Sequence, residues 1–367
     1  MKIDNISITN FLSIRELKNF KLNDINILIG GNGVGKTNFI SFLKLLKHIS
    51  NKELRTYVAG RSGANNILYK GSKISLLLKG RVEFNNHNAY EFVLQRNNEN
   101  KFYFSSEIAA YYYSNNWQNH ASDIQGSSES TLDSIIAKYS KQKGYIGVPG
   151  YVKAALAGFE IYHFHDTSSN SPIKQSSQIN DNRFLRFDGS NIASFLYMLE
   201  KKHPIVYKRI IGTIRTIAPF FDQFMIEGLI LDEEMVQLDW KEMGSDKYFG
   251  PHQLSDGSIR MIALITLLLQ PNPPSTIIID EPELGLHPAA IGLLAELIKQ
   301  VSKKSQVIIS TQSVTLINHF EPKDLIIVER EDQQTVLKKL DEDECVKWIG
   351  EYSLGDVWEK NILGGRP

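Results

Sequence analysis

The most constraining feature of this sequence is a glycine-rich turn between a strand-like run and a helix-like run. Residues 25–29 form a nearly continuous apolar run, and the segment Gly30-Gly31-Asn32-Gly33-Val34-Gly35-Lys36-Thr37 follows it directly. From Thr37 onward, apolar residues recur at helical spacing. The segment fits the pattern G-x-x-x-x-G-K-[ST] in the strand–loop–helix context that this pattern requires. We therefore expect an α/β protein built around a phosphate-binding loop.

Each residue type in this segment suits contact with a polyphosphate. Glycines allow successive backbone N–H groups to turn toward one anion. The helix that begins near Gly35 adds the partial positive charge of its N-terminus. Lys36 supplies a charge for the β- and γ-phosphates, and the Thr37 hydroxyl can bind Mg²⁺. The predicted nucleotide-binding residues of this segment are Gly30, Asn32, Gly33, Val34, Gly35, Lys36 and Thr37.

A second apolar run ends in two carboxylates. Residues 277–279 are three isoleucines, and Asp280 and Glu281 follow them. Asp280 can hold the hydration shell of Mg²⁺, so it joins Thr37 as a predicted metal ligand. Glu281 can orient or deprotonate the water that attacks the γ-phosphate, so it is a predicted catalytic residue. A buried strand that ends in a solvated acidic turn has the same pattern, and the phosphate-binding loop is what favours the catalytic interpretation.

Two further segments have the spacing of a composite ATPase site. Leu254-Ser255-Asp256-Gly257-Ser258 precedes a long apolar helix, and Asp280 follows Leu254 by 26 positions. Gln312 follows the end of another buried strand, 32 positions after Asp280. Buried strands alternate with helices from residue 249 to residue 330, which predicts a parallel sheet.

This set of segments resembles the ABC-type ATPase heads of the RecF and SMC class. Residues 30–37 are similar to their Walker A motif, which a residue like Asn38 often follows. Residues 277–281 resemble Walker B, residues 254–257 resemble the LSGG signature, and residues 283–288 resemble the D-loop. The opening strand, residues 5–14, is similar to that of RecF-like proteins. The resemblance covers residues 1–50 and 245–330.

Within that class, the sequence is most similar to compact bacterial predicted ATPases related to the OLD-family ATPase domain. Those proteins often end in a tryptophan followed by a Gly-Gly-Arg-Pro-like tail, as Trp358 and residues 364–367 do here. Residues 164–168 also resemble that group, although the sequence gives them no mechanism. A Q-loop is expected near residues 64–70.

The resemblance implies a P-loop NTPase fold with a mostly parallel core sheet, an antiparallel β-subdomain and a helical insertion. It implies ATP and Mg²⁺ as cofactors, with Asn38 among the nucleotide-binding residues. Ser255 and Gly257 of one subunit would contact the ATP that another subunit holds, which implies a head-to-tail homodimer or a higher homo-oligomer. Gln312 occupies the switch position as the second expected catalytic residue. Its amide can donate a hydrogen bond but cannot take up a proton, so slow ATP hydrolysis is expected.

The sequence predicts three segments with different patterns. An N-terminal ATPase lobe, residues 1–113, contains a strand at 4–14 and an antiparallel meander after residue 73. An insertion, residues 114–245, contains polar loops and two helices, and residues 246–367 form the C-terminal ATPase lobe. Within the insertion, the loops are expected at 114–148 and 166–183, a short helix near 132–139, and the two helices at 191–202 and 204–220.

Charge and composition exclude several classes of protein. The chain has 41 Lys+Arg and 41 Asp+Glu, so its formal net charge of zero argues against a globally basic nucleic-acid binder. Its one cysteine, Cys345, cannot form an internal disulfide or a cysteine-based zinc site. The N-terminus lacks the apolar run of a signal peptide, and no apolar stretch approaches the ~20 residues of a membrane span. We expect a cytoplasmic protein with no membrane partner.

What the resemblance implies about function is an ATP-driven switch that controls a separately encoded effector, often a TOPRIM-like nuclease, in bacterial genome maintenance or anti-phage defence. The chain has neither sustained heptads nor room for a fused nuclease domain after residue 330. Two alternatives stay open: a DNA-binding repair ATPase that loads other factors, and an ATP-binding scaffold with little turnover. Two basic clusters are either duplex-DNA contacts or solvated helix faces: Lys44, Lys47, Lys52, Arg55 and Arg61, and Lys201, Lys202, Lys208, Arg209 and Arg215.

Overall fold

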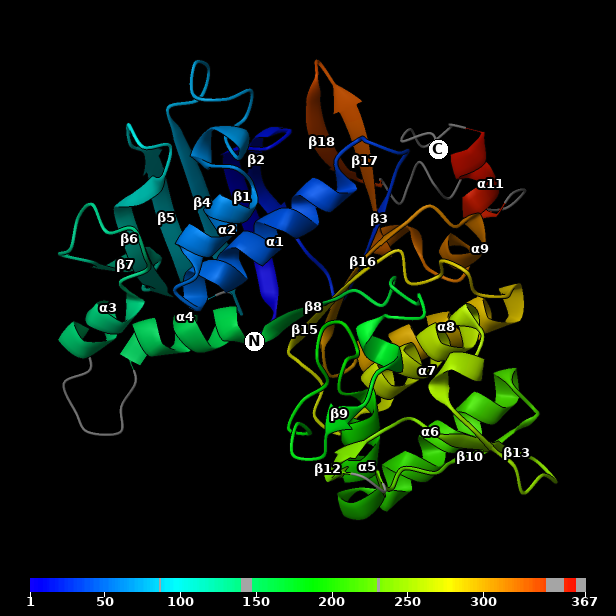
Figure 1. Cartoon of the computed structure of the whole chain (residues 1–367). Coiled ribbons are helices and arrows are strands. Elements are labelled where there is room, and N and C mark those ends of the chain that lie inside the picture. The colour runs from blue at the N-terminus through cyan, green and yellow to red at the C-terminus, as the bar shows by residue number, and fades with distance from the viewer. Residues whose placement is uncertain (86, 140–146, 230–231, 341–352, 361–367) are drawn as a thin grey trace. The chain divides into compact units, whose positions relative to one another are not determined.

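The chain forms two compact units in a computed structural model (Figure 1). One unit comprises Met1–Glu160 together with Glu321–Pro367, and the other is Ile161–Phe320. The domain boundaries expected at 113/114 and 245/246 stay predictions. The structure describes residues 1–85, 87–139, 147–229, 232–340 and 353–360. Cys345 and the tail at residues 364–367 lie outside these ranges.

A six-stranded antiparallel sheet forms much of the first unit. The strand order is β2-β1-β4-β5-β6-β7. In β4, buried Leu78, Gly80, Val82 and Phe84 alternate with more exposed residues, so one face of the sheet is apolar. The strands are β1 (Ile3–Phe11), β2 (Ile14–Lys21), β4 (Leu77–Phe84), β5 (Asn88–Arg96), β6 (Phe102–Tyr113) and β7 (Asn116–Ala121).

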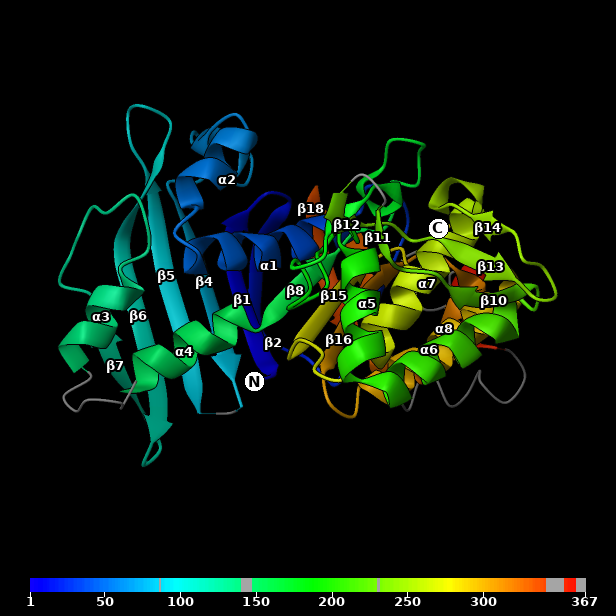
Figure 2. The same ribbon diagram turned by 60° about the horizontal axis from the view of Figure 1, so that its bottom comes forward.

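Helices cover that apolar face (Figure 2). Phe42 of α1 contacts Phe11 and Phe92 of the sheet, with ring centroids 5.5 and 6.3 Å apart. Gly80 makes room for this packing, because a Cβ there would lie 2.8 Å from the Phe42 ring. The helices are α1 (Lys36–Ser50), α2 (Leu54–Gly60), α3 (Leu132–Tyr139) and α4 (Gly147–Ala157).

A second group of strands in this unit leads into the phosphate-binding loop. β3 (Ile25–Ile29) is buried at all five residues and pairs in parallel with β17 (Leu325–Glu331). β17 pairs in turn with β18 (Gln334–Lys339) as an antiparallel hairpin. The β17–β18 hairpin therefore lies beside the strand that leads into Gly30. Helix α11 (Leu354–Glu359) follows.

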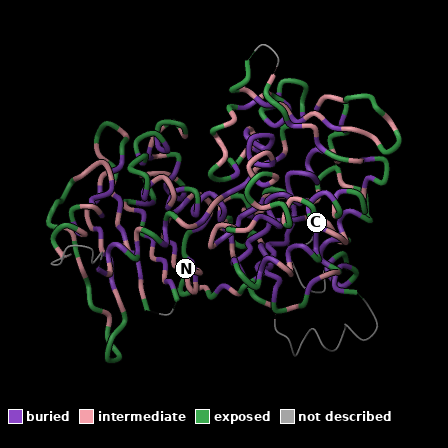
Figure 3. The backbone as a smooth tube through the Cα atoms, turned by 90° about the horizontal axis from the view of Figure 1, so that it is seen from below, coloured by how far each residue is buried: buried purple, intermediate pink, exposed green. Residues whose placement is uncertain are grey.

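The second unit contains a parallel strand pair and the most buried helix of the described chain. β15 (Thr276–Asp280) pairs in parallel with β16 (Gln306–Thr311). α7 (Asp256–Leu269) is buried at every residue from Ile259 onward, as its nearly continuous apolar sequence requires. Figure 3 shows the interior of each unit as mostly buried chain. The other main helices are α5 (Ile192–Lys202), α6 (Pro204–Ile217), α8 (Pro288–Val301) and α9 (Val314–Ile317).

Shorter strands complete the second unit. They form two small antiparallel sheets, ordered β10-β13-β14 and β11-β12-β9. β8 (Phe159–Tyr162) spans the point where the chain passes from the first unit to the second. The small strands are β9 (Ser177–Gln178), β10 (Phe221–Phe224), β11 (Gly228–Leu229), β12 (Asp232–Val236), β13 (Trp240–Glu242) and β14 (Tyr248–Phe249).

The structure confirms the α/β class, with parallel strand pairs and an antiparallel β-subdomain. The single strand predicted at 4–14 is wrong, because the chain turns at Leu12 (φ 49°) and Phe11 pairs with Ile14. The 114–148 region contains β7 and the start of α4 in addition to the predicted helix α3. In the described ranges, no helix combines the length and apolar character that a membrane span needs.

Candidate functional site

The phosphate-binding loop of the first unit has a shape that only glycine allows at two positions. A Cβ at Gly30 would lie 2.2 Å from the Val328 carbonyl oxygen of β17. Gly35 has a φ of 115°, and a Cβ there would lie 2.0 Å from Thr335 Oγ1 of β18. Gly35 is also the N-cap of α1 and has no side chain that could bond the first helical N–H groups. The N-terminus of α1 is therefore open to an anion.

Lys36 already lies inside the curve of this loop. It is buried, and its Nζ donates hydrogen bonds to the carbonyl oxygens of Gly30 at 2.5 Å and Gly31 at 2.9 Å. Thr37 and Asn32 are exposed. The ammonium group is thus fixed at the loop, and the Thr37 hydroxyl is open to a ligand, as contact with a phosphate and its metal ion requires.

A polar chain from two distant hairpins braces the loop. Thr335 Oγ1 donates a hydrogen bond to the Val34 carbonyl at 2.6 Å and lies 2.6 Å from Ser13 Oγ. The Asn38 amide donates to Ser13 Oγ, also at 2.6 Å. The Thr335 backbone N–H in turn donates to the Ser13 carbonyl at 2.8 Å. We call Ser13, Asn38 and Thr335 the loop brace, since they tie β18 and the β1–β2 turn to the loop and to α1.

A cavity of about 660 Å³ borders the loop brace in the same unit. Its lining combines side-chain amides, two cationic residues and an aromatic ring, and Ser13 and Asn38 form part of its wall. Residues 64–71, where a Q-loop was expected, supply much of the remaining wall. The cavity matches the size range of small-molecule sites. The lining residues that can contact a ligand by polar or ring atoms include Asn65, Asn66, Tyr69, Lys70, Arg330 and Gln333.

The predicted catalytic residues of the second unit meet at the carboxyl ends of two parallel strands. Asp280 pairs in register with Ser310, and Ser310 Oγ donates a hydrogen bond to Asp280 Oδ1. Glu281, the residue after Asp280, accepts a hydrogen bond at Oε1 from Gln312 Nε2 at 2.7 Å. The structure therefore brings Glu281 and Gln312 together, 31 positions apart in sequence.

Glu281 has a backbone conformation that side chains rarely adopt. Its φ is 40°, and its N–H donates to the Ser310 carbonyl at 2.9 Å, so the neighbouring strand fixes it there. Non-glycine residues with such φ angles cost free energy and concentrate at functional sites. Glu281 directly follows β15, and its carboxylate accepts the hydrogen bond from Gln312 in this conformation.

Glu283 lies next to this pair and is largely withdrawn from water. Burial raises the pKa of its carboxyl, and the nearby Glu281 charge acts in the same direction. Hydrogen bonds from the Thr311 hydroxyl and the Gln312 N–H to Oε1 oppose that rise, whereas Oε2 is buried and has no hydrogen-bond partner among the described residues. Glu283 is therefore a second, less readily ionised carboxyl beside the predicted catalytic one.

The signature residues lie at the start of α7. Ser255 is the N-cap, accepts a hydrogen bond from the Ser258 N–H at 3.1 Å, and is exposed. A Cβ at Gly257 would lie 2.6 Å from the Gly285 carbonyl oxygen in the D-loop, so glycine allows α7 to approach that loop closely. An exposed serine at a helix N-terminus can contact a phosphate of a second copy.

These residues fit ATP and Mg²⁺. In the first unit, the glycine cradle and the Lys36 ammonium suit a polyphosphate, and the Thr37 hydroxyl suits a hard cation bound with it. In the second unit, the Asp280 carboxylate is an oxygen ligand of the kind that Mg²⁺ takes. No group of three or more His, Cys, Asp or Glu side chains in the described ranges could hold a metal ion by itself.

Sequence patterns did not reveal the residues that support this site. Thr335 lies 301 positions from Val34, and a lone threonine in a strand carries no signal. Ser310 was part of a predicted strand, without a role. Residues 164–168 have no chemical signal of their own beyond the resemblance.

The two basic clusters are largely occupied by contacts within the protein. Lys47 pairs with Glu160, Lys52 with Asp133, and Arg55 with Glu129. In the second cluster, Lys201 pairs with Glu200 and Arg215 with Asp222. These charges are partly neutralised and are less available to phosphates. Binding of duplex DNA stays a prediction that no contact in the described ranges favours.

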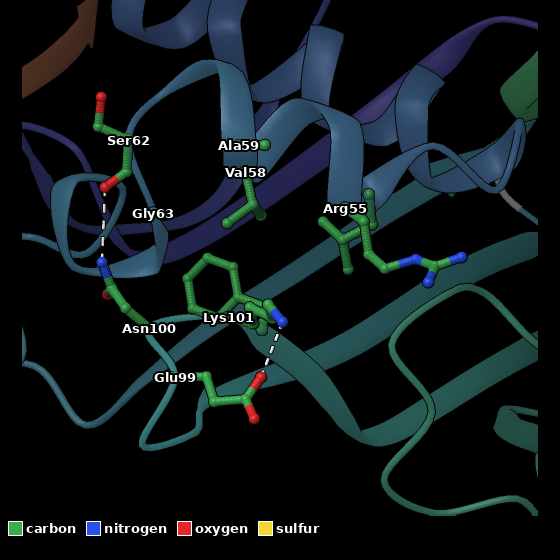
Figure 4. Close-up of a pocket in the computed structure, with 10 residues that line it drawn as sticks. Arg55, Val58, Ala59, Ser62, Gly63, Glu99, Asn100 and Lys101 are labelled. Carbon is green, nitrogen blue, oxygen red and sulfur yellow. Dashed lines mark hydrogen bonds and ion pairs between the residues drawn. The ribbon is translucent and has the colours of Figure 1, made fainter.

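A separate, mainly apolar pocket of about 380 Å³ lies between α2 and the β5–β6 turn (Figure 4). Val58 and Ala59 line one side. At its rim, Lys101 pairs with Glu99 at 2.7 Å, as the dashed line in Figure 4 marks. None of the predicted site residues lines this pocket.

Residues 25–318 match a family described as "AAA domain, putative AbiEii toxin, Type IV TA system". The chain belongs to this family. The match begins at β3 and ends beyond the switch residue Gln312, so it includes every predicted site residue. A search of curated proteins finds no match.

Solved structures with the same fold are heads of SMC proteins. One is an SMC head bound to the C-terminal winged-helix domain of ScpA, with a TM-score of 0.61 and 16% identity over 95% of this chain and 100% of that one. Another is an SMC head with an extended coiled coil, bound to the C-terminal domain of ScpA from Pyrococcus furiosus. Its TM-score is 0.56, with 13% identity over 95% of this chain and 98% of that one. The family model thus shows that the chain belongs to an AAA-domain family, and its fold is similar to that of the SMC heads.

Proposed function

We propose that the protein hydrolyses ATP and uses its nucleotide state to control a partner protein. The observation that carries this proposal is the 2.7 Å hydrogen bond from the Gln312 amide to the Glu281 carboxylate. A binding module that never turns over ATP needs no carboxylate fixed in a strained backbone at the end of β15. Such strain is typical of residues that act in chemistry.

The phosphate-binding loop supplies nucleotide binding in this proposal. The N-terminus of α1, the glycine backbone and Lys36 bind the phosphates. The cavity bordered by Ser13 and Asn38 takes the nucleoside, and its amide and ring groups can bond and stack on a base. Thr37 and Asp280 would help to hold Mg²⁺, which would supply positive charge for the phosphate oxygens.

Glu281 and Gln312 act on the attacking water. The Glu281 carboxylate accepts a proton from water as the water oxygen bonds to the γ-phosphorus, while the bond to the β–γ bridging oxygen breaks and ADP leaves. Gln312 orients the carboxylate by donating to Oε1. An amide cannot relay the proton further, so slow turnover is expected.

The signature residues act on a second copy of the chain. Ser255 and the Gly257 N–H of one subunit would contact the γ-phosphate held by another, so ATP favours a head-to-tail dimer. Hydrolysis removes that differential contact and releases the dimer. Support comes from the exposure of Ser255 and from the position of Gly257 at the start of a 14-residue helix.

The partner in this proposal is a separately encoded effector, such as a TOPRIM-like nuclease, and the setting is bacterial anti-phage defence. Both solved SMC heads are bound to a domain of another protein, so this fold can carry a partner. The family description names a putative toxin of a toxin–antitoxin system, which supports a defence role.

Phosphate release and oligomeric state test the proposal together. Wild-type protein with Mg-ATP should release phosphate, and Glu281→Gln should release at least ~100-fold less while accumulating a dimer on a sizing column. Lys36→Ala, which cannot bind the phosphates properly, serves as the control for contaminating ATPase. Absence of phosphate release above that control would favour an assembly scaffold and refute the proposed enzyme.

A further inference from the structure

Residues 164–168, which the sequence singled out, take no part in the chemistry above. In the structure they lie within the second unit, after β8 and before the 3₁₀ turn Pro172–Lys174. We call residues 164–168 the connector segment. Its backbone and side chains contact the signature helix α7, the end of β15 and, through a shared arginine, the D-loop.

Arg260 of α7 holds two of these elements at once. Its side chain is 6% exposed, and its guanidinium donates to three backbone carbonyls. Nε donates to the Phe164 oxygen at 3.0 Å, Nη2 donates to the His165 oxygen at 3.1 Å, and Nη1 donates to the Leu284 oxygen in the D-loop. The planar guanidinium of arginine has donors in fixed directions and can bond three carbonyls at once, whereas the ammonium group of lysine cannot span them in this way.

His165 extends the contact from the connector segment to the carboxylates. Its Nε2 lies 2.6 Å from the carbonyl oxygen of Asp280. Because a carbonyl can only accept a hydrogen bond, Nε2 carries the proton in this contact. The peptide group that His165 contacts joins Asp280, the predicted metal ligand, to Glu281, the predicted general base.

Lys174 makes a second link to the signature. It is 6% exposed, and its Nζ donates to the Thr167 oxygen at 2.5 Å and pairs with Asp256 Oδ1 at 3.1 Å. Asp256 lies between Ser255 and Gly257. The N-terminal part of α7 is therefore tied to the connector segment through Lys174 at Asp256 and directly at Arg260.

We propose that Arg260 and His165 are positioning residues that couple the signature helix to the end of β15. When Ser255 contacts a γ-phosphate, a shift of α7 is transmitted through Arg260 to the connector segment and through His165 to the Asp280–Glu281 peptide. ATP binding at the phosphate-binding loop does not need this path, whereas alignment of Glu281 with the water does. The inference rests on the proposed ATPase function and assigns a regulation to the same site.

The test separates nucleotide binding from turnover. Arg260→Met and His165→Leu should each lower kcat about tenfold or more, as misplacement of a catalytic group does, while ATP affinity measured with a fluorescent ATP analogue stays close to wild type. His165→Gln, whose amide can donate to the same carbonyl, should retain most of the activity that His165→Leu loses. Arg209→Gln is the matched control, because Arg209 is exposed on α6 and its guanidinium donates a hydrogen bond to Gln300, away from the connector segment.

Each outcome of this test either supports the coupling or refutes it. Loss of kcat with retained affinity, and rescue by His165→Gln, supports the coupling. Wild-type kcat in both Arg260→Met and His165→Leu overturns it, as does an equal loss in the glutamine and leucine variants of His165. If Arg260→Met unfolds in a thermal melt, the two His165 variants decide alone. If wild-type protein releases no phosphate, the proposed ATPase function fails first, and the coupling fails with it.

Discussion

Removal of the Gln312 amide should slow ATP hydrolysis without weakening ATP binding. In Gln312→Leu, the hydrogen bond of 2.7 Å to Glu281 Oε1 is lost and the side-chain volume is nearly kept. A hydrogen bond to a charged group contributes about 1.5–3 kcal/mol. Both side chains are only partly buried, so water competes and the lower end applies. At ~1.4 kcal/mol per factor of ten, kcat should fall about tenfold.

The assay is phosphate release at saturating Mg-ATP for a double-mutant cycle. Glu281→Gln alone should lose ~100-fold or more, because glutamine cannot accept the proton. If Gln312 acts through Glu281, the double variant should be no slower than Glu281→Gln. Gln300→Leu, on α8, is the control for loss of a glutamine amide. A wild-type kcat in Gln312→Leu, or fully additive losses in the double variant, would refute this role.

Three further predictions concern the supports of the site and its pH dependence. Thr335→Val removes two hydrogen bonds of the loop brace, so it should lower the free energy of unfolding by about 1–3 kcal/mol and weaken ATP binding. Thr335→Ser keeps the hydroxyl and is the control. Identical melting temperatures and ATP affinities for the two variants would contradict this prediction. Gly35→Ala, which places a Cβ against Thr335 at a φ of 115°, should abolish binding of a fluorescent ATP analogue, and retained binding would disprove the steric argument. Burial raises the pKa of Glu283 above its usual 4.5, so ionisation of this carboxyl destabilises the folded protein. The destabilisation is absent below pH 4.5 and fully present above the folded-state pKa. In denaturant unfolding, Glu283→Gln should therefore have a higher free energy of unfolding than wild type at neutral pH, and this difference should shrink in acid. A difference that stays constant with pH would contradict the raised pKa.

The sequence alone predicts those parts of the site whose functional residues are neighbours in the chain. The glycine loop, the isoleucine strand that ends at Asp280, and the turn before α7 each carry their residues within a few positions. Strand and helix periods then place them at strand ends and helix starts, where the structure has them.

Elements that depend on tertiary packing were not predictable in the same way. The sequence of α4 disfavours a helix, since it contains Gly147, Pro149 and Gly150. The helix forms because it packs on α1 and the sheet. Its proline lies in the first turn, where the backbone N–H needs no partner within the helix. The turn at Leu12 contains no glycine or proline, so the sequence does not predict it. Thr335 and Ser13 contact the loop only after β18 and the β1–β2 turn have folded beside it.

Complementation between two inactive variants tests the central claim most directly. Lys36→Ala disables the phosphate-binding loop and Ser255→Arg disables the signature, so neither variant should release phosphate alone. In a head-to-tail dimer of the two, one site combines an intact loop with an intact signature, and an equal mixture should recover up to about a quarter of the wild-type rate. If the mixture stays as inactive as its components while wild type releases phosphate, ATP is not shared between two copies of this chain.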